Sequence, residues 1–258
     1  MNKILLISTF LITPFLIGCS NNEDTNLNQT ETSKKKPVSL YTGYKLPSLL
    51  EQSSKPVTLS EITTLLDKKW YAEFNVIQVD VEDKTYTLST CNSLQSINTK
   101  KLNTVRENES APFLDVLVMC KATKLIAKAK ASQKSFLESF TLDETLPKNL
   151  PASIGMVISD TESKRNAKNT NLKYWYQVNT ITNIIKQGQN HVTYILNDGS
   201  QQELELVAKG DFNGDSIEDI LITSRDTVQG GSYSATRLFL LTKHSVTGDI
   251  LSLPLIIQ

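Results

Sequence analysis

From residue 172 onward, the sequence alternates apolar and polar residues between short turn signals, and this pattern constrains the fold more than any other. The alternating runs cover 174–185, 191–196 and 202–208, and the turn sequences Gly-Gln-Asn and Asn-Asp-Gly separate them. Asp-Gly between such runs is a strong hairpin signal, because glycine accepts the positive φ of a tight turn. Further runs at 217–223, 236–242 and 250–256 continue the pattern. The sequence therefore predicts an antiparallel β-sheet in the second half.

The first half contains the clearest helical pattern of the chain, over residues 111–131. Its apolar residues Val118, Ala122, Leu125, Ile126 and Ala129 recur at the spacing of one buried helix face. Shorter helices are predicted at 57–69 and 135–140, with a hairpin within 70–90. The expected fold class is therefore α+β: a helical, disulfide-bridged N-terminal half packed with a C-terminal antiparallel β-sheet.

Two groups of side chains allow more than one interpretation. Lys121, Lys124 and Lys128 form a stripe on the predicted helix, which is either a solvated face or an anion-binding surface. Trp175 lies between two tyrosines, and strand alternation would direct it to one face of the sheet. That face is either the core or an exposed platform for stacking sugars.

The chain begins with an apolar run that is too short to span a membrane. Lys3 precedes apolar residues 4–17, and Gly18 and Cys19 follow. A spanning helix needs about 20 apolar residues, so this run reads as a secretory signal peptide over residues 1–18. Leu16-Ile17-Gly18-Cys19 resembles the lipobox of bacterial lipoprotein precursors. The alternative is a plain signal peptide whose last residues happen to read this way.

The lipoprotein resemblance implies an address and an anchor. In that family the cysteine, here Cys19, receives diacylglycerol, and its amino group is acylated after cleavage. Ser20 follows Cys19 where an Asp would retain the protein in the inner membrane, so the resemblance implies the outer membrane of the cell envelope, on its periplasmic or surface face. Residues 19–37 are polar after the cysteine and are expected to form a flexible tether. Their lysines at 34–36 are either solvated linker charges or contacts to anionic lipid.

Cysteine use fits a chain outside the cytoplasm. The sequence has three cysteines, and Cys19 is assigned to the lipid. In an oxidising compartment, Cys91 and Cys120 are expected to form a disulfide, worth roughly 3–4 kcal/mol for a loop of about 30 residues. The alternative is a Cys–His nucleophile that uses His191 or His244.

Composition limits the partners. The chain has 27 basic and 27 acidic residues, so no basic excess is available to neutralise nucleic-acid phosphates. The hydrophobic content of 39% is enough for a packed core. Residues 38–258 are expected to form a single α+β globular region, with a sub-boundary near 145–172.

One stretch carries metal chemistry. Residues 211–219 place oxygen side chains at alternate positions: Asp211, Asn213, Asp215 and Asp219, with Ile217 able to offer its backbone carbonyl. This is the ligand register of a loop that coils around Ca²⁺. The alternative is a metal-free Asp/Asn/Gly turn.

The stretch Gly210–Ile222 resembles the calcium loops of FG-GAP and VCBS-type repeats. The resemblance covers one copy of a short motif and implies structural Ca²⁺ held by those five residues. Two features depart from an EF-hand: Ser216 stands where the sixth position is usually Gly, and Ile222 stands where the twelfth is a bidentate Glu.

These observations favour a lipid-anchored, calcium-stabilised binding or scaffolding module with an envelope protein or glycan as partner. No catalytic residue is assigned, and the prediction leans away from an enzyme. Two alternatives stay open: an envelope hydrolase with a structural calcium site, and a lysozyme or protease inhibitor.

Overall fold

The computed structural model describes residues 35–41, 57–79, 84–97, 102–253 and 255. Residues 1–34 lie outside this set, and with them the predicted signal peptide and the lipidation site Cys19. None of the described helices has the length and apolar character needed to cross a membrane.

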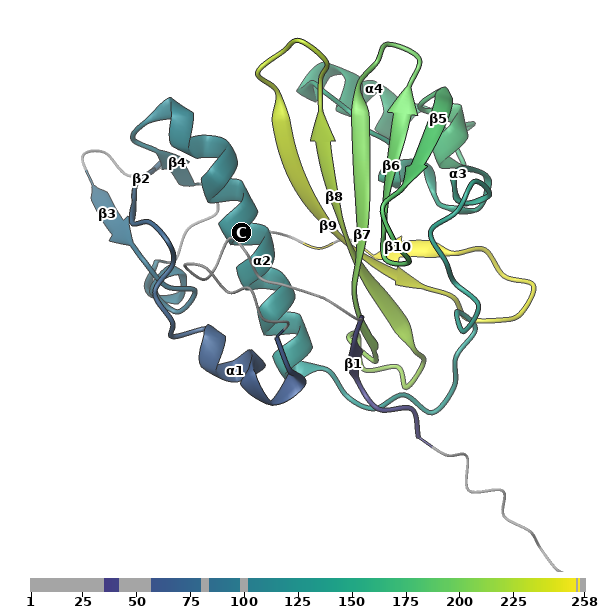
Figure 1. Ribbon diagram of the computed structural model, residues 1–258, viewed down its shortest axis with the longest axis horizontal. Helices are drawn as coiled ribbons and strands as arrows, with labels where there is room; N and C mark the ends of the chain where they lie inside the picture. The colour runs from purple at the N-terminus through teal and green to yellow at the C-terminus, as the bar shows by residue number, and fades with distance from the viewer. Residues whose placement is uncertain (1–34, 42–56, 80–83, 98–101, 254, 256–258) are drawn as a thin grey trace, which may run out of the picture. The chain divides into compact units, whose positions relative to one another are not determined.

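A large antiparallel sheet dominates the second half (Figure 1). Its strands are β5 (Ile181–Lys186), β6 (His191–Leu196), β7 (Gln201–Gly210), β8 (Asp219–Thr227), β9 (Ser234–Thr242) and β10 (Leu251–Leu253). They lie in the order β10-β9-β8-β7-β6-β5, and β1 (Ser39–Leu40) pairs with the end of β7. The Asp-Gly hairpin between β6 and β7 is confirmed: Gly199 has φ +80°.

Both faces of this sheet are buried. Along β8, Leu221 belongs to one core and its neighbours Ile220 and Ile222 belong to a second core on the other face. This division follows from strand geometry, because successive side chains point to opposite faces. Apolar residues are therefore consecutive where both cores cover a strand, as at Ile220–Ile222 of β8 and Leu238–Leu241 of β9.

The first core joins the sheet to the first half of the chain. Helix α2 (Ser110–Lys128) contributes Phe113, Val116 and Ala122 to it. A small sheet of order β3-β2-β4 also joins this core, and Phe74 on its central strand contacts Phe113 with ring centroids 5.3 Å apart. The small sheet consists of β2 (Phe74–Gln78), β3 (Thr85–Leu88) and β4 (Leu102–Thr104).

A disulfide ties these elements together. The sulfur atoms of Cys91 and Cys120 lie at bonding distance, with their Cα atoms 5.3 Å apart. Both side chains are buried in the first core. Neither thiol is then available for the alternative Cys–His nucleophile.

The expected α+β class, with a helical first half packed with a C-terminal sheet, is wrong. The described chain is mostly β-sheet, and its first half supplies a sheet of its own. Apart from α2, the described α-helices are short: α1 (Ile62–Leu65), α3 (Leu146–Asn149) and α4 (Asp160–Lys168). The hairpin predicted within 70–90 is present as β2 and β3, but β4, which was not predicted, pairs with β2 and completes a second sheet in the first half.

Residues 130–180 cover the other face of the large sheet with little regular structure. The predicted helix at 135–140 does not form: this stretch holds a turn in which the Phe140 N–H binds the Leu137 carbonyl, and the residues just before it, Gln133 and Lys134, bond to the β7–β8 connection. Trp175 begins a 3-10 helix (Trp175–Gln177) rather than lying in a strand, and it is fully buried against Tyr194. The sugar-platform interpretation of Trp175 is therefore wrong.

A buried ion pair connects this covering segment to the sheet. Asp226 on β8 is fully buried, and its Oδ2 lies 2.8 Å from an Arg237 guanidinium nitrogen on β9. Arg237 also donates to the carbonyls of Ser153, Ile154 and Gly155. Burial raises the pKa of Asp226, and the Arg237 charge opposes this rise. One guanidinium thus pairs with a buried carboxylate and donates to the turn that covers it.

We predict that Arg237→Met lowers the free energy of unfolding by about 3–5 kcal/mol, because it leaves the Asp226 charge buried and unpaired. Urea unfolding followed by circular dichroism measures this. The matched control is Arg225→Met: Arg225 is on the same sheet but half-exposed, and it pairs with Asp115 at 3.4 Å. An exposed pair of this kind contributes about 0–1 kcal/mol. Equal losses in the two variants would contradict the prediction.

Candidate functional site

The acidic loop, defined as residues 211–219, connects β7 to β8 with its two ends held together. Gly210 at the end of β7 is paired with Asp219 at the start of β8. Asp211 and Asp219 are buried, whereas Asn213 and Asp215 are exposed. The predicted ligand residues therefore lie in one tight connection, with an acidic side chain at each end.

The loop's polar side chains cap its own backbone. Asp211 accepts the N–H of Gly214 at 2.6 Å and that of Ser216 at 3.0 Å, one on each carboxylate oxygen. Asn213 accepts the N–H of Asp215, and Asp215 accepts that of Ile217. Each side chain thus holds the peptide two to five residues further on, which is the geometry of Asx turns.

Ser216 adopts the conformation expected of a glycine. Its φ is +68°, and it is the one non-glycine with positive φ in the described ranges. A left-handed backbone costs an L-residue about 1–2 kcal/mol. Ser216 occupies the sixth position of the calcium-loop register, where glycine makes the sharp turn. The departure noted in the sequence therefore leaves the backbone path unchanged.

Asp219 carries a buried carboxylate with one oxygen unsatisfied. Its Oδ2 accepts the Phe212 N–H at 3.1 Å, but its Oδ1 makes no hydrogen bond. Burial, together with the charges of Asp215 and Asp211, raises the pKa of Asp219 to about 6. The Thr242 hydroxyl beside the carboxylate opposes the rise as a donor, although its geometry falls short of a regular hydrogen bond. Negative charge at the base of the loop is therefore poorly compensated.

Segment 130–135 borders the loop. The Ser216 carbonyl accepts the Gln133 N–H at 2.8 Å, and the Lys134 carbonyl accepts the Glu218 N–H at 2.8 Å. Ser135 Oγ donates to Glu218 at 2.7 Å. On another side, His244 Nδ1 lies 3.8 Å from Asp215 Oδ2. The loop is thus contacted on two sides by residues from other parts of the chain.

The oxygen atoms of the loop are of the kind that bind a hard cation, but they do not converge on one point as the ligands of a formed metal site do. In the part of the chain that the structure describes, no three His, Cys, Asp or Glu side chains are grouped to hold a metal ion. The predicted set also includes the Asn213 amide and the Ile217 carbonyl. A carboxylate oxygen that accepts one N–H keeps a second lone pair. The buried, unsatisfied Asp219 Oδ1 is the atom that a cation would satisfy.

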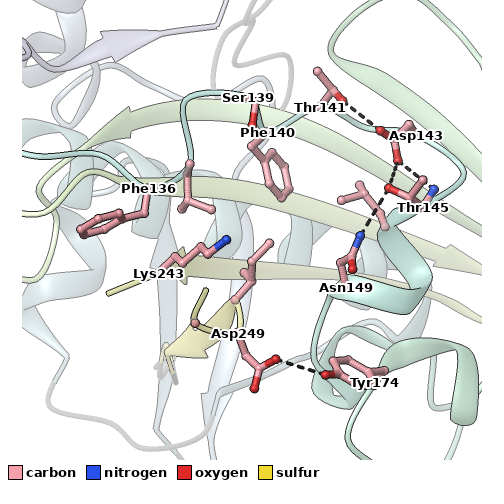
Figure 2. A pocket seen from close by; sticks show the side chains of 14 residues that line it. Phe136, Ser139, Phe140, Thr141, Asp143, Thr145, Asn149, Tyr174, Lys243 and Asp249 are labelled. Carbon is pink, nitrogen blue, oxygen red and sulfur yellow. Dashed lines mark hydrogen bonds between the residues drawn. The ribbon is translucent and has the colours of Figure 1, made fainter. Parts of the chain in front are cut away.

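Figure 2 shows a cavity, of about 300 Å³, that is lined by residues adjoining the neighbours of this loop. Phe136 and Phe140 line it from the segment that follows Ser135. Lys243, which precedes His244, and Asp249 line it from the connection between β9 and β10. The two stretches that border the loop therefore continue directly into residues that line the cavity.

Hydrogen bonds hold the acidic groups of the cavity in place. Asp143 accepts from the Thr145 N–H and hydroxyl and from Thr141, and these bonds lower its pKa although burial acts the other way. Asp249 accepts from the Tyr174 hydroxyl at 3.1 Å and pairs with Lys173 at 3.0 Å. Both carboxylates are already occupied by protein donors.

Sequence reasoning gathered the loop residues but missed the cavity. Its lining comes from three separated stretches around residues 136–149, 174 and 243–250, and no periodic pattern marks any of them. The histidines named in the nucleophile alternative lie apart from any thiol: His191 faces Glu203 at 3.7 Å, and His244 faces Asp215.

No protein-family model, no curated protein and no solved structure matches this chain.

We predict that Ser216→Gly raises the free energy of unfolding by about 0.5–1 kcal/mol, because glycine adopts this φ without strain. Gly214→Ala is the reciprocal test. Gly214 has φ +88°, and an added Cβ would meet no atom within 4 Å, so any loss of about 1 kcal/mol reports backbone strain alone. Urea unfolding of both variants measures the pair. Destabilisation by Ser216→Gly would show that the serine side chain has a role of its own.

Proposed function

We propose that this chain is a lipid-anchored envelope protein whose C-terminal sheet carries a calcium-stabilised binding site. Ca²⁺ would be held by Asp211, Asn213, Asp215, the Ile217 carbonyl and Asp219. Its role would be to neutralise the carboxylates and fix the β7–β8 connection. The partner would bind at the surface that this connection supports.

The observation that carries the calcium part is the Asp219 carboxylate. It is buried, one of its oxygens lacks a hydrogen bond, and two further acidic side chains of the same loop raise its pKa. A buried carboxylate in this state lowers stability unless a positive charge compensates it. The left-handed Ser216 adds support, since it preserves the path of a calcium loop.

The anchor part of the proposal rests on the first residues of the sequence, which lie outside the described structure. Three acyl chains on Cys19 would hold the protein at a membrane, since each buried methylene contributes about 0.8 kcal/mol and two chains already give stable anchoring.

Calcium is predicted to raise the melting temperature of the purified protein. At about 100 times its dissociation constant, a ligand adds ~2.7 kcal/mol, which corresponds to a shift of about 5–10 °C for a domain of this size. Calorimetry in 10 mM Ca²⁺ and in chelator measures the shift. In Asp215→Asn, the amide oxygen still caps Ile217, but the charge is lost, so the shift should shrink strongly.

The control for the calcium experiment is Asp198→Asn. Asp198 caps the Ser200 N–H at 2.9 Å in the β6–β7 turn, so it has the same local role outside the acidic loop. This variant should keep the full calcium shift. Equal melting temperatures of the native protein in Ca²⁺ and in chelator would refute the calcium proposal.

Replacement of Cys19 by serine is predicted to release the protein from membranes. The native protein should sediment with the outer-membrane fraction and incorporate labelled fatty acid, whereas Cys19→Ser should do neither. Ser20→Asp provides the second variant: it should remain acylated but move to the inner membrane. Sedimentation of Cys19→Ser with membranes would refute the anchor.

A further inference from the structure

The cavity in Figure 2 has the size and lining of a site for one small polar molecule. Its volume of about 300 Å³ lies at the lower end of the range for small-molecule sites, roughly 300–1,000 Å³. A cavity of this volume has room for one sugar ring. The lining combines aromatic side chains with hydroxyl, amide and charged groups.

Lys243 is the one charged group of this lining that has no close partner. Asp143 and Asp249 are satisfied by threonine, tyrosine and lysine donors, as described above. Lys243 is half-buried and makes no hydrogen bond or ion pair that the described residues supply; its charge acts on Asp249 only at longer range. An ammonium placed in this way favours a ligand that carries a negative group.

The remaining lining favours a hydroxyl-rich ring. Phe136 and Phe140 offer apolar faces, while Asn149 makes only a long hydrogen bond of 3.4 Å to Thr145. The Asn149 amide therefore keeps donor and acceptor capacity for ligand hydroxyls. A purely apolar ligand would leave these groups and Lys243 without partners, at a cost in affinity.

A stacked tyrosine pair continues from the cavity to the surface. The rings of Tyr174 and Tyr176 lie 6.2 Å apart with an interplanar angle of 16°. Tyr174 lines the cavity, and Tyr176 is 49% exposed. Flat aromatic faces of this kind pack against the apolar face of a sugar ring, so a second sugar unit has a surface to lie on outside the cavity.

We propose that this cavity binds a carboxylated sugar of the uronic acid class. Lys243 pairs with the carboxylate, Asn149 with ring hydroxyls, and the phenylalanine rings cover the apolar side. The inference rests on the proposed function, because it names the ligand class of that binding module. It also transfers the sugar contact from Trp175, which is buried, to the neighbouring tyrosines.

The test is a calorimetric titration of the full-length protein in Ca²⁺ with sodium D-glucuronate and D-galacturonate, compared with glucose and acetate. At least one uronate should bind in the millimolar range or tighter, and at least tenfold more tightly than glucose and acetate. Lys243→Met should weaken uronate binding at least tenfold. Lys148→Met is the matched control: Lys148 is exposed on α3 next to Asn149 but does not line the cavity, and its loss should leave binding unchanged.

Asn149→Ala provides a second variant if Lys243→Met does not fold, and it should weaken uronate binding at least threefold. Three results would each overturn the inference: no uronate binding, equal binding of glucose or acetate, or native affinity in Lys243→Met. The two proposals fail separately. Absent uronate binding with an intact calcium shift removes only the ligand assignment, whereas uronate binding without a calcium shift removes only the metal.

Discussion

Burial of the large sheet on both faces is the constraint on which the other features depend. β7, β8 and β9 pair over long antiparallel registers, and their side chains fill a different core on each side. Where both faces are covered, polar groups on the strands must find partners inside the protein. Asp226 and Asp219 are two buried carboxylates on β8 that meet this requirement in different ways.

The two carboxylates show what compensation requires. Asp226 has the Arg237 guanidinium at 2.8 Å and a hydrogen bond from Ser224 at 2.6 Å. Asp219 has one N–H bond and the neighbouring Thr242 hydroxyl, and its loop adds two more negative charges. The same strand thus contains one buried carboxylate with a cationic partner and one buried carboxylate without such a partner. The difference is local and electrostatic, and it makes a cation a physical expectation for Asp219 but not for Asp226.

Local patterns could be predicted from the sequence, whereas the arrangement of the first half could not. β6 has the predicted bounds of 191–196, and α2 begins and ends within a few residues of the predicted 111–131. The hairpin within 70–90 was predicted, but the fold class was wrong because β4 also pairs with β2 and makes a second sheet of the first half. The predicted helix at 135–140 does not form, and the residues just before it are held by bonds far away in sequence: the Gln133 N–H binds Ser216, and the Lys134 carbonyl accepts the Glu218 N–H.

The acidic loop could be predicted from the sequence, whereas the cavity could not. The two features are nevertheless connected by neighbouring residues. The predicted calcium ligands all lie within nine consecutive residues. The cavity, in contrast, forms only when three separate stretches of the chain meet on the sheet. Two of these stretches are fixed by the loop: Ser135 bonds Glu218 just before Phe136, and His244 faces Asp215 just after Lys243. A cation that fixed the loop would therefore also fix the positions of Phe136 and Lys243. Order at the acidic loop would in this way reach the cavity through neighbouring residues, without contact between metal and ligand.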